Sequence, residues 1–496
     1  MYRSTRSEAE PVGAAKAILD GLAPDGGLYV PVSIPCLPAR VLSAEPLSYA
    51  ELASLVLAPY FPQFPAEGLR AAIDRSASRF SCSDVAPLVE RSGFHFLELF
   101  HGPTLAFKDL ALTLMGALAR LAMRTEGVSD ELVVLVATSG DTGKAALSGF
   151  AEESGVSVAV FYPAYGVSPV QRLQMVCHDA PNSIVIGIRG SFDDAQRGVK
   201  AIFGSEGATS ALSKRGMRLT SANSINIARL LPQIVYYVKA WRDLRDAGRL
   251  GNDRTMDVAV PTGNFGNILA AWYAREMGVP IGRFYCASND NKVLADFLGD
   301  SVYDRNRPFY VTSSPSMDIL VSSNLERLVF AATSSDSGRT AGYMRALAET
   351  GRFSLTKGER AAFADFRGGW ADEAEASAAI RRVFEDSGYL LDPHTAVAVA
   401  VAEKARSANS SRPVVVAATA SPFKFPVAVA RAIGMDIPVD GGAEAELDLA
   451  MRLAERTGLE LPAAIADLRG KPELHASVID PAEMERALLS SPRLER

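Results

Sequence analysis

One pattern recurs along the chain and limits the folds open to it: an apolar run, a turn rich in glycine or small polar residues, then a helical pattern. The apolar runs are ELVVLVA (131–137), VSVAVFYP (156–163), MDVAVP (256–261) and RPVVVAATA (412–420). Continuously apolar strands that alternate with helices are typical of parallel sheets covered on both faces. The sequence therefore predicts an α/β fold, in which ligands bind at the carboxyl ends of the strands.

The remaining regions predict mostly helices. The first ninety or so residues are mostly helical in pattern, FHFLEL (94–99) is a short strand, and apolar residues recur at helical spacing over 108–124. The stretch 335–390, rich in Arg, Ala and Glu, predicts amphipathic helices that cover a surface. From about 435 onward the Ala/Glu/Leu-rich chain predicts a peripheral helical segment.

Composition excludes several function classes. The 496 residues carry a net charge of −6, which favours neither nucleic acid nor an anionic membrane as a partner. The N-terminal MYRSTRSEAEP is unlike a secretory signal, and no uncharged apolar run reaches the ~18 residues that a membrane helix needs. Cys36, Cys82, Cys177 and Cys286 lack metal-ligand spacing. We expect a cytoplasmic protein with reduced core thiols and no metal site.

Two of the turns carry unusual polar residues. TGNFGN (262–267) follows a strand and opens a helix, where glycines and free N–H groups make a phosphate cradle or simply a tight turn. Its spacing is not that of dinucleotide or nucleoside-triphosphate motifs. TSGDTG (138–143) brings Ser139, Asp141 and Thr142 to a second turn, where the same residue types also serve as ordinary helix caps.

SANSINIARLLPQ (221–233) groups Asn223, Ser224, Asn226 and Arg229 near a helix start. An arginine with amide and hydroxyl groups suits an oxyanion ligand. Ser224 and Arg229 converge only if the helix begins between them or a turn bends there. A capped helix with a surface arginine is the alternative.

FHGPTLAFKDLALTLMG (100–116) places Lys108 in an otherwise apolar or small run, at or just before a helix N-terminus. Burial and the positive end of the helix dipole should lower the pKa of this lysine. A neutral amine is a nucleophile suited to Schiff-base chemistry, and together with a phosphate cradle it suggests pyridoxal 5′-phosphate (PLP). An ion pair with Asp109, or a surface lysine, is the alternative.

The chain also resembles a known family through ordered motifs. They are YRSTR (2–6), LAPDGGLYVP (22–31), FHGPTLAFKD (100–109), ATSGDTG (137–143), YPAYGVSPVQRLQM (162–175), SFDDAQ (191–196), SANSINIARLLPQ (221–233), VPTGNFGNILA (260–270), SPSMDI (314–319) and DPHTAVA (391–397). With them, residues 2 to about 430 resemble the threonine synthase family, PLP enzymes of fold type II. The resemblance implies two parallel or mixed sheet domains with N-terminal and C-terminal helical segments. The division it implies is 1–93, a catalytic core over 94–430 whose smaller domain spans about 125–245, and a peripheral helical segment over 431–496.

The resemblance implies a cofactor site. Lys108 would form the Schiff base with PLP, and Thr419 would face the pyridine nitrogen. Ser139 and Asp141 match positions that contact the substrate carboxylate and the cofactor 3′-oxygen. The residues implied to hold the cofactor phosphate are Gly263, Asn264, Phe265, Gly266 and Asn267.

The resemblance also implies a substrate site. Asn223, Ser224 and Arg229 match positions that bind the substrate phosphate, and Ser139 and Thr142 complete the substrate contacts. The implied reaction converts O-phospho-L-homoserine and water to L-threonine and phosphate, by a monomer or homodimer. The alternatives are a phospho-lyase that gives 2-oxobutyrate, a non-catalytic PLP-binding homologue, and a phosphate-binding α/β module without PLP.

One departure from the family pattern is visible. Many members read TAHPAKF where this chain has TASPFKF (419–425), so Ser421 replaces a histidine. Thr419 and Lys424 persist in this stretch. We interpret position 421 as part of a local strand-to-helix turn.

Overall fold

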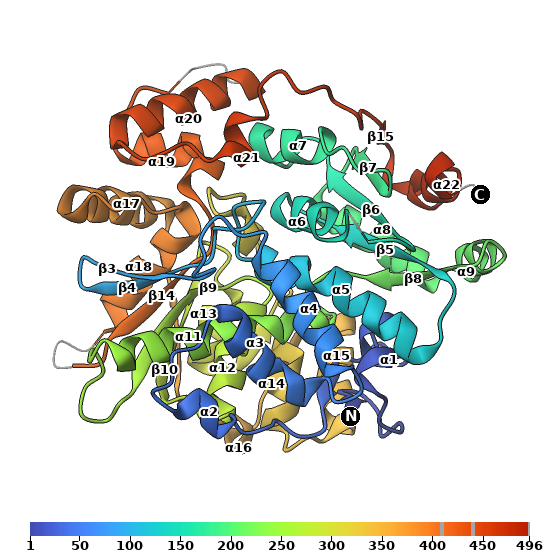
Figure 1. Cartoon of the computed structure of the whole chain (residues 1–496), viewed down its shortest axis with the longest axis horizontal. Helices are drawn as coiled ribbons and strands as arrows, with labels where there is room; N and C mark the ends of the chain where they lie inside the picture. Colours follow the sequence, from blue (N-terminus) through green and yellow to red (C-terminus); the bar gives the residue numbers. More distant parts are fainter. Residues whose placement is uncertain (152, 407–410, 438–441, 495–496) are drawn as a thin grey trace.

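Two predominantly parallel sheets organise the chain (Figure 1). The computed structural model describes residues 1–151, 153–406, 411–437 and 442–494. The larger sheet has the strand order β13-β10-β9-β14-β4-β3, and the smaller sheet has the order β15-β7-β6-β5-β8. Within the described residues, β3 alone runs antiparallel to its neighbour in these two sheets. The predicted α/β fold is confirmed.

The strands have short, well-defined bounds. Those of the larger sheet are β3 (Leu88–Arg91), β4 (Phe94–Glu98), β9 (Met256–Pro261), β10 (Ile281–Ser288), β13 (Phe366–Trp370) and β14 (Val414–Ala418). Those of the smaller sheet are β5 (Glu131–Ala137), β6 (Val156–Pro163), β7 (Ser183–Ile188), β8 (Met217–Ser221) and β15 (Val478–Ile479). The predicted strands at 131–137, 156–163 and 256–261 are therefore confirmed.

The apolar runs are continuous because both faces of their strands are buried. In β5, Leu132, Val134 and Val136 join the main hydrophobic core, while Val133 and Leu135 join a second core on the opposite face. Alternate residues of a strand point to opposite faces, so a strand buried on both sides needs apolar residues throughout. The second core is covered by α8 (Phe192–Gly204) and α9 (Glu206–Ser213).

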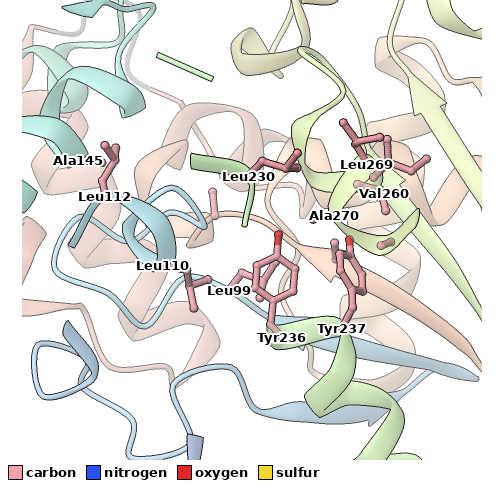
Figure 2. Close-up of a cluster of buried hydrophobic side chains, with 14 of the residues drawn as sticks. Leu99, Leu110, Leu112, Ala145, Leu230, Tyr236, Tyr237, Val260, Leu269 and Ala270 are labelled. Atoms are coloured by element: carbon pink, nitrogen blue, oxygen red, sulfur yellow. The ribbon is translucent and has the colours of Figure 1, made fainter. Parts of the chain in front are cut away.

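The main core extends from the larger sheet to one face of the smaller sheet. Figure 2 shows part of it, with Tyr236 and Tyr237 side by side near Leu230 and Ala270. The helices that meet there are α5 (Asp109–Glu126), α6 (Asp141–Phe150), α10 (Ile227–Leu230), α11 (Pro232–Asp246) and α12 (Gly266–Glu276). This packing fixes the starts of α5, α10 and α12 relative to one another.

The remaining helices surround the sheets. The N-terminal segment contributes α1 (Ala14–Asp20), α2 (Ala39–Leu42), α3 (Tyr49–Leu57) and α4 (Ala66–Ala77), together with the strand pair β1 (Tyr2–Ser4) and β2 (Tyr29–Pro31). Later helices are α7 (Pro169–Val176), α13 (Val293–Asp300), α14 (Leu325–Ala332), α15 (Ser337–Thr350), α16 (Lys357–Arg360), α17 (Glu373–Ser387), α18 (Pro393–Ala405) and α19 (Pro426–Ala432). A second pair of short strands is β11 (Val302–Asp304) and β12 (Arg352–Ser354).

The expectation of helices alone over 335–390 is wrong. FRGGW (366–370) forms β13 at the edge of the larger sheet, beside β10. A Cβ at Gly368 would lie 2.7 Å from the carbonyl oxygen of Ala295 in α13, and one at Gly369 would lie 2.6 Å from Val401 in α18. The two glycines therefore let a helix approach each face of this strand.

The expectation of a purely helical C-terminal segment is also wrong. Of the range 431–496, residues 438–441 and 495–496 lie outside the described residues. The described part holds α20 (Ala443–Thr457), α21 (Ala463–Ala466) and α22 (Met484–Leu489), but β15 pairs with β7 of the smaller sheet. Figure 1 shows the described part running from α20, at the top of the molecule, to α22 beside the smaller sheet. Met484 and Leu488 of α22 complete the second core.

The cysteines and the absence of a membrane helix are two further expectations from the sequence. All four cysteines are free, but Cys286 is buried whereas Cys36 is exposed, so the prediction of core thiols is wrong for Cys36. Within the described parts of the chain, no helix is both long enough and apolar enough to cross a membrane.

Candidate active site

Lys108 stands where the loop after β4 enters α5, as the N-cap residue of that helix. The loop is fixed by the segment after β14: the Phe107 N–H donates to the Thr419 carbonyl at 2.8 Å, and Ala106 pairs with Ala420 in an isolated bridge. The backbone at Lys108 therefore lies at the carboxyl end of the neighbouring strands β4 and β14.

The Lys108 side chain is 11% exposed and points into a polar contact network. Its Nζ lies 2.9 Å from Ser316 Oγ and 3.3 Å from Asp141 Oδ2. Asp109 instead accepts hydrogen bonds from the Thr104 N–H and hydroxyl. The alternative of a Lys108–Asp109 ion pair or a surface lysine is therefore wrong.

Burial lowers the pKa of Lys108. The Asp141 carboxylate acts in the opposite direction, while the Lys424 and Arg229 cations lower the pKa of Lys108 further. The expected lowering of the pKa of Lys108 is confirmed in direction, and it favours a neutral, nucleophilic amine.

Asp141, the first residue of α6, lies between two lysines. Lys424 Nζ contacts Asp141 Oδ1 at 2.7 Å, and Gln171 Nε2 donates to the same oxygen at 2.9 Å. Burial alone would raise the pKa of Asp141, but the Lys424 and Lys108 cations outweigh it and hold the pKa well below its usual range. Asp141 is therefore an ionised carboxylate in the protein interior.

In the 138–143 turn, the capping role belongs to Thr138. Its Oγ1 accepts the N–H groups of Gly140 and Gly143 at 3.0 and 2.9 Å. Gly140 has a φ of 131°, and a Cβ there would lie 2.7 Å from the Gln171 amide, so this position requires glycine. Ser139 and Thr142 are partly exposed at the start of α6 and are not the cap.

The 262–267 turn runs from β9 to α12. In the part of the chain that the structure describes, the N–H groups of Gly263, Asn264 and Phe265 donate to no protein acceptor. Phe265 takes a left-handed backbone (φ 61°) just before the helix, and Gly266 is the first residue of α12. Such a turn presents free N–H groups at the positive end of a helix, which suits a phosphate.

Asn267 adds a side-chain donor to this turn. Its Oδ1 accepts hydrogen bonds from Tyr236 and Tyr237 at 2.9 and 2.5 Å, while its buried Nδ2 has no partner among the described residues. Figure 2 shows the two tyrosine hydroxyls pointing in the same direction. An unpartnered buried donor beside free N–H groups fits the phosphate of PLP.

The turn lies against the residue that contacts Lys108. A Cβ on Gly263 would lie 2.5 Å from the carbonyl oxygen of Ser316, so glycine lets these two segments meet. Ser316 belongs to the turn η2 (Pro315–Met317), and its N–H donates to His394 Nε2 at 3.2 Å. His394 Nδ1 lies 2.8 Å from Asp392 Oδ1, so a buried Asp–His pair supports the Ser316 loop.

The 223–229 segment satisfies the condition for convergence, because α10 begins at Ile227, between Ser224 and Arg229. Asn226 is the helix cap: its Oδ1 accepts the Ala228 N–H, and its Nδ2 donates to the Ile18 and Ser221 carbonyls. Asn226 is therefore a structural residue.

Arg229 is buried rather than a surface arginine. Its Nη1 donates to the Ala222 carbonyl at 2.6 Å, but within the described residues its buried Nε has no partner. Burial lowers the pKa of Arg229 to about 10, so it stays positively charged at neutral pH. The buried Oδ1 of Asn223 is likewise unpartnered in the described chain.

A short hydrogen-bonded path joins this segment to the 262–267 turn. Ser224 Oγ lies 3.3 Å from Ser323 Oγ, which donates to Asn264 Oδ1 at 3.2 Å. The two regions able to bind anions are therefore neighbours, both close to Lys108.

Thr419 and Ser421 flank the same site. Thr419 is 4% exposed, and its N–H donates to Thr395 Oγ1 at 3.3 Å. Ser421 separates β14 from the turn η4 (Pro422–Lys424), and its N–H donates to the Leu105 carbonyl. The interpretation of position 421 as a strand-to-helix turn is confirmed.

Sequence reasoning gave no role to Ser316, Lys424, Gln171 and His394, which the structure brings to this site. SPSMDI, DPHTAVA and YPAYGVSPVQRLQM were recognisable motifs, but their spacing does not reveal that they meet. For Lys424 a signal existed: SPFKFP sets a lysine in an apolar run, as AFKDL does for Lys108.

Comparisons with known proteins point to one family over most of the chain. Three family models match successive parts: Threonine synthase N terminus over residues 1–77, Pyridoxal-phosphate dependent enzyme over 85–420, and Threonine synthase, C-terminal over 395–486. The chain is similar to the threonine synthase of Pseudomonas aeruginosa, with 39% identity over 439 residues, which cover 87% of this chain and 90% of that protein.

Two further relatives extend this result. Threonine synthase-like 1 of Homo sapiens is 40% identical over 84% of this chain, which spans only 58% of that longer protein. A solved structure of PLP-bound threonine synthase from Brucella melitensis has a TM-score of 0.86 and 37% identity, covering 98% of each chain. The expected fold type II architecture is thereby confirmed. The chain belongs to the threonine synthase family of pyridoxal-phosphate-dependent enzymes.

Proposed function

We propose that this protein converts O-phospho-L-homoserine and water to L-threonine and phosphate, with PLP as its cofactor. The observation that carries the proposal is the position of Lys108, a largely buried lysine beside two neighbouring regions able to bind anions. One is the 262–267 turn, and the other is the segment with Arg229. A cofactor phosphate and a substrate phosphate together require two such regions.

The 262–267 turn would hold the cofactor phosphate through its free N–H groups and Asn267 Nδ2. Asp141 and Ser139, at the start of α6, would contact the cofactor 3′-oxygen and the substrate carboxylate, and Thr419 would face the pyridine nitrogen. Bound PLP supplies an electron sink for the negative charge that develops at the substrate Cα. The 262–267 turn suits that cofactor, because its unpartnered N–H groups and Asn267 Nδ2 are donors for an anion.

Arg229, with Asn223 and Ser224, would bind the phosphate of the substrate. A buried guanidinium with an unused N–H forms a strong charge-assisted hydrogen bond to a phosphate oxygen. As the phosphate leaves Cγ, the Arg229 cation would stabilise the charge that it carries away. Ser139 and Thr142 would bind the substrate carboxylate.

Lys108 would be the base that moves protons. Its Nζ, held by Ser316 and Asp141, would take a proton from Cα and then one from Cβ of the substrate. A lowered pKa keeps this amine able to accept a proton near neutral pH. Water then adds at Cβ, and the protons return at Cγ and Cα.

The decisive experiment incubates the PLP-loaded protein with O-phospho-L-homoserine and quantifies phosphate and amino acids. Threonine and phosphate in equal amounts support the proposal. Phosphate with 2-oxobutyrate as the main product would make the protein a phospho-lyase. No phosphate release from protein saturated with PLP would leave a non-catalytic PLP-binding homologue. The cytoplasmic location and the monomeric or homodimeric state expected from the sequence stay predictions.

A further inference from the structure

Lys424 has no exposed surface, yet it carries an ammonium group. Its Nζ lies 2.7 Å from Asp141 Oδ1 and donates to the Thr104 carbonyl at 2.8 Å. A buried ammonium is unfavourable unless a carboxylate and further hydrogen bonds compensate its lost hydration. These two contacts provide that compensation.

The contacts join three separate parts of the fold. Asp141 follows β5 of the smaller sheet, Thr104 lies in the loop that leads to Lys108, and Lys424 follows β14 of the larger sheet. Thr104 also holds Asp109 through its N–H and hydroxyl. One cation therefore fixes the Asp141 carboxylate relative to the loop that carries Lys108.

The two lysines contact opposite oxygens of one carboxylate, Lys424 at Oδ1 and Lys108 at Oδ2. Further charged or titratable groups act on this cluster from the elements around it. They are Arg229 of α10, His394 of α18, Asp109 of α5 and Lys144 of α6. With the Asp141 charge offset by Lys424, the carboxylate attracts a proton on Lys108 less strongly than an unpaired carboxylate would.

We propose that Lys424 is a positioning residue that orients Asp141 toward Lys108 and offsets its charge, so that the Lys108 nitrogen is more readily deprotonated. The catalytic meaning of this role rests on the proposed function, because only there is Lys108 the base. The arrangement of charge itself is a property of the chain and can be measured without substrate.

The test compares four proteins: wild type, Lys424→Met, Asp141→Asn and the double variant. In PLP-free protein, the rate at which an amine-acylating reagent labels Lys108, followed by peptide mass spectrometry across pH, gives the pKa of Lys108. We expect Lys424→Met to raise this pKa and Asp141→Asn to lower it, each by about 1 to 3 pH units. The double variant should return close to wild type, since it removes one charge of each sign.

Two further measurements accompany the labelling. In PLP-loaded protein, a pH titration of the absorbance of the bound cofactor should shift in the same directions. The melting temperature of the PLP-free protein should fall in both single variants, and by less in the double variant than the two losses together, because a removed partner leaves a buried charge unpaired. Lys239→Met is the matched control, since Lys239 is also a buried lysine but pairs with Asp243 and Asp84.

Labelling curves that coincide for wild type and Lys424→Met, or shifts in the same direction for the two single variants, would overturn the proposal. If Lys424→Met does not fold, Asp141→Asn and the double variant still test the proposal. Restoration of the Lys108 pKa in the double variant requires that Lys424 and Asp141 act on Lys108 as a pair. These measurements do not depend on the proposed function. If the Lys108 pKa shifts as expected but the protein forms no threonine, the proposed function is refuted and the role of Lys424 still holds.

Discussion

Ser316 and Lys108 are 208 positions apart in the chain, yet Ser316 Oγ lies 2.9 Å from Lys108 Nζ. The same hydroxyl also lies 3.3 Å from Asp141 Oδ2, so it bridges the lysine and the carboxylate. A side chain from η2 thus bridges Lys108, the N-cap residue of α5, and Asp141, the first residue of α6. It sets the direction in which the Lys108 amine points.

Ser316→Ala should keep PLP bound but lower kcat by about threefold to tenfold, the effect of one hydrogen bond that orients the reacting amine. Steady-state kinetics with O-phospho-L-homoserine measure it. Ser313→Ala is the control, because Ser313 lies in the same loop but bonds to exposed Glu373. Equal losses in both variants would indicate a general disturbance of the loop.

Lys108→Ala should abolish turnover and the covalent attachment of PLP while the protein still folds. No other lysine among the described residues contacts both Ser316 and Asp141. Borohydride reduction followed by peptide mass spectrometry checks it: the added cofactor mass should be on Lys108 in wild type and absent in the variant. Lys144→Ala is the control, because burial also lowers the pKa of Lys144, to about 8. This variant should retain the adduct at Lys108.

Arg229→Ala should leave PLP bound, since the cofactor phosphate belongs to the 262–267 turn. It should lower kcat/KM for O-phospho-L-homoserine by about thirtyfold to a thousandfold, or about 2–4 kcal/mol of transition-state stabilisation. Arg242→Ala provides the matched control, because this buried arginine donates to the Val41, Ser43 and Glu45 carbonyls away from the site. Loss of PLP in proportion to activity in Arg229→Ala would contradict the division into two anion sites.

Asn226→Ala should destabilise the protein by about 2–4 kcal/mol, through loss of a helix cap and of donors to two buried carbonyls. Urea unfolding monitored by fluorescence gives the value. Asn223→Ala, three positions earlier, should change stability far less and substrate use far more. The opposite ranking would mean that the two asparagines have been assigned the wrong way round.

Stability should rise with pH between about 3 and 6.5 because of His178. Burial and the nearby Lys144 cation lower the pKa of His178 to about 3, while an unfolded histidine titrates near 6.5. In that interval the unfolded chain binds more protons, so folding is favoured as pH increases. His178→Gln should flatten the slope of melting temperature against pH there, whereas His101→Gln, a change on a partly exposed ring elsewhere, serves as the comparison. An unchanged slope would show that His178 titrates alike in both states.

The sequence predicts best those strands that are buried on both faces. The apolar runs of β5, β6 and β9 are visible because both faces of each strand are covered. β13 could not be predicted in this way, because an edge strand with two glycines has neither an apolar run nor a clear alternation of apolar and polar residues. β15 spans only Val478–Ile479, too short for any periodic signal.

At the site, sequence reasoning finds residues within one motif but not the contacts between motifs. Asn223, Ser224 and Arg229 are candidates because they are close in sequence, yet nothing in that sequence separates Asn226, a cap, from its neighbours. The contact of Lys424 with Asp141 joins two sheets and depends on the packing of the whole core. Such contacts follow from tertiary structure and carry no local pattern.

The placement of β15 and α22 has a consequence for how the chain folds as it is made. The smaller sheet begins with β5 near residue 131 but receives its edge strand and the α22 cover only from residues 478–489. During synthesis, therefore, β7 stays without its final neighbour until residues 478–479 have left the ribosome. An unpaired strand edge invites association with other chains, so the smaller sheet of the growing protein is exposed to aggregation until that segment has been made.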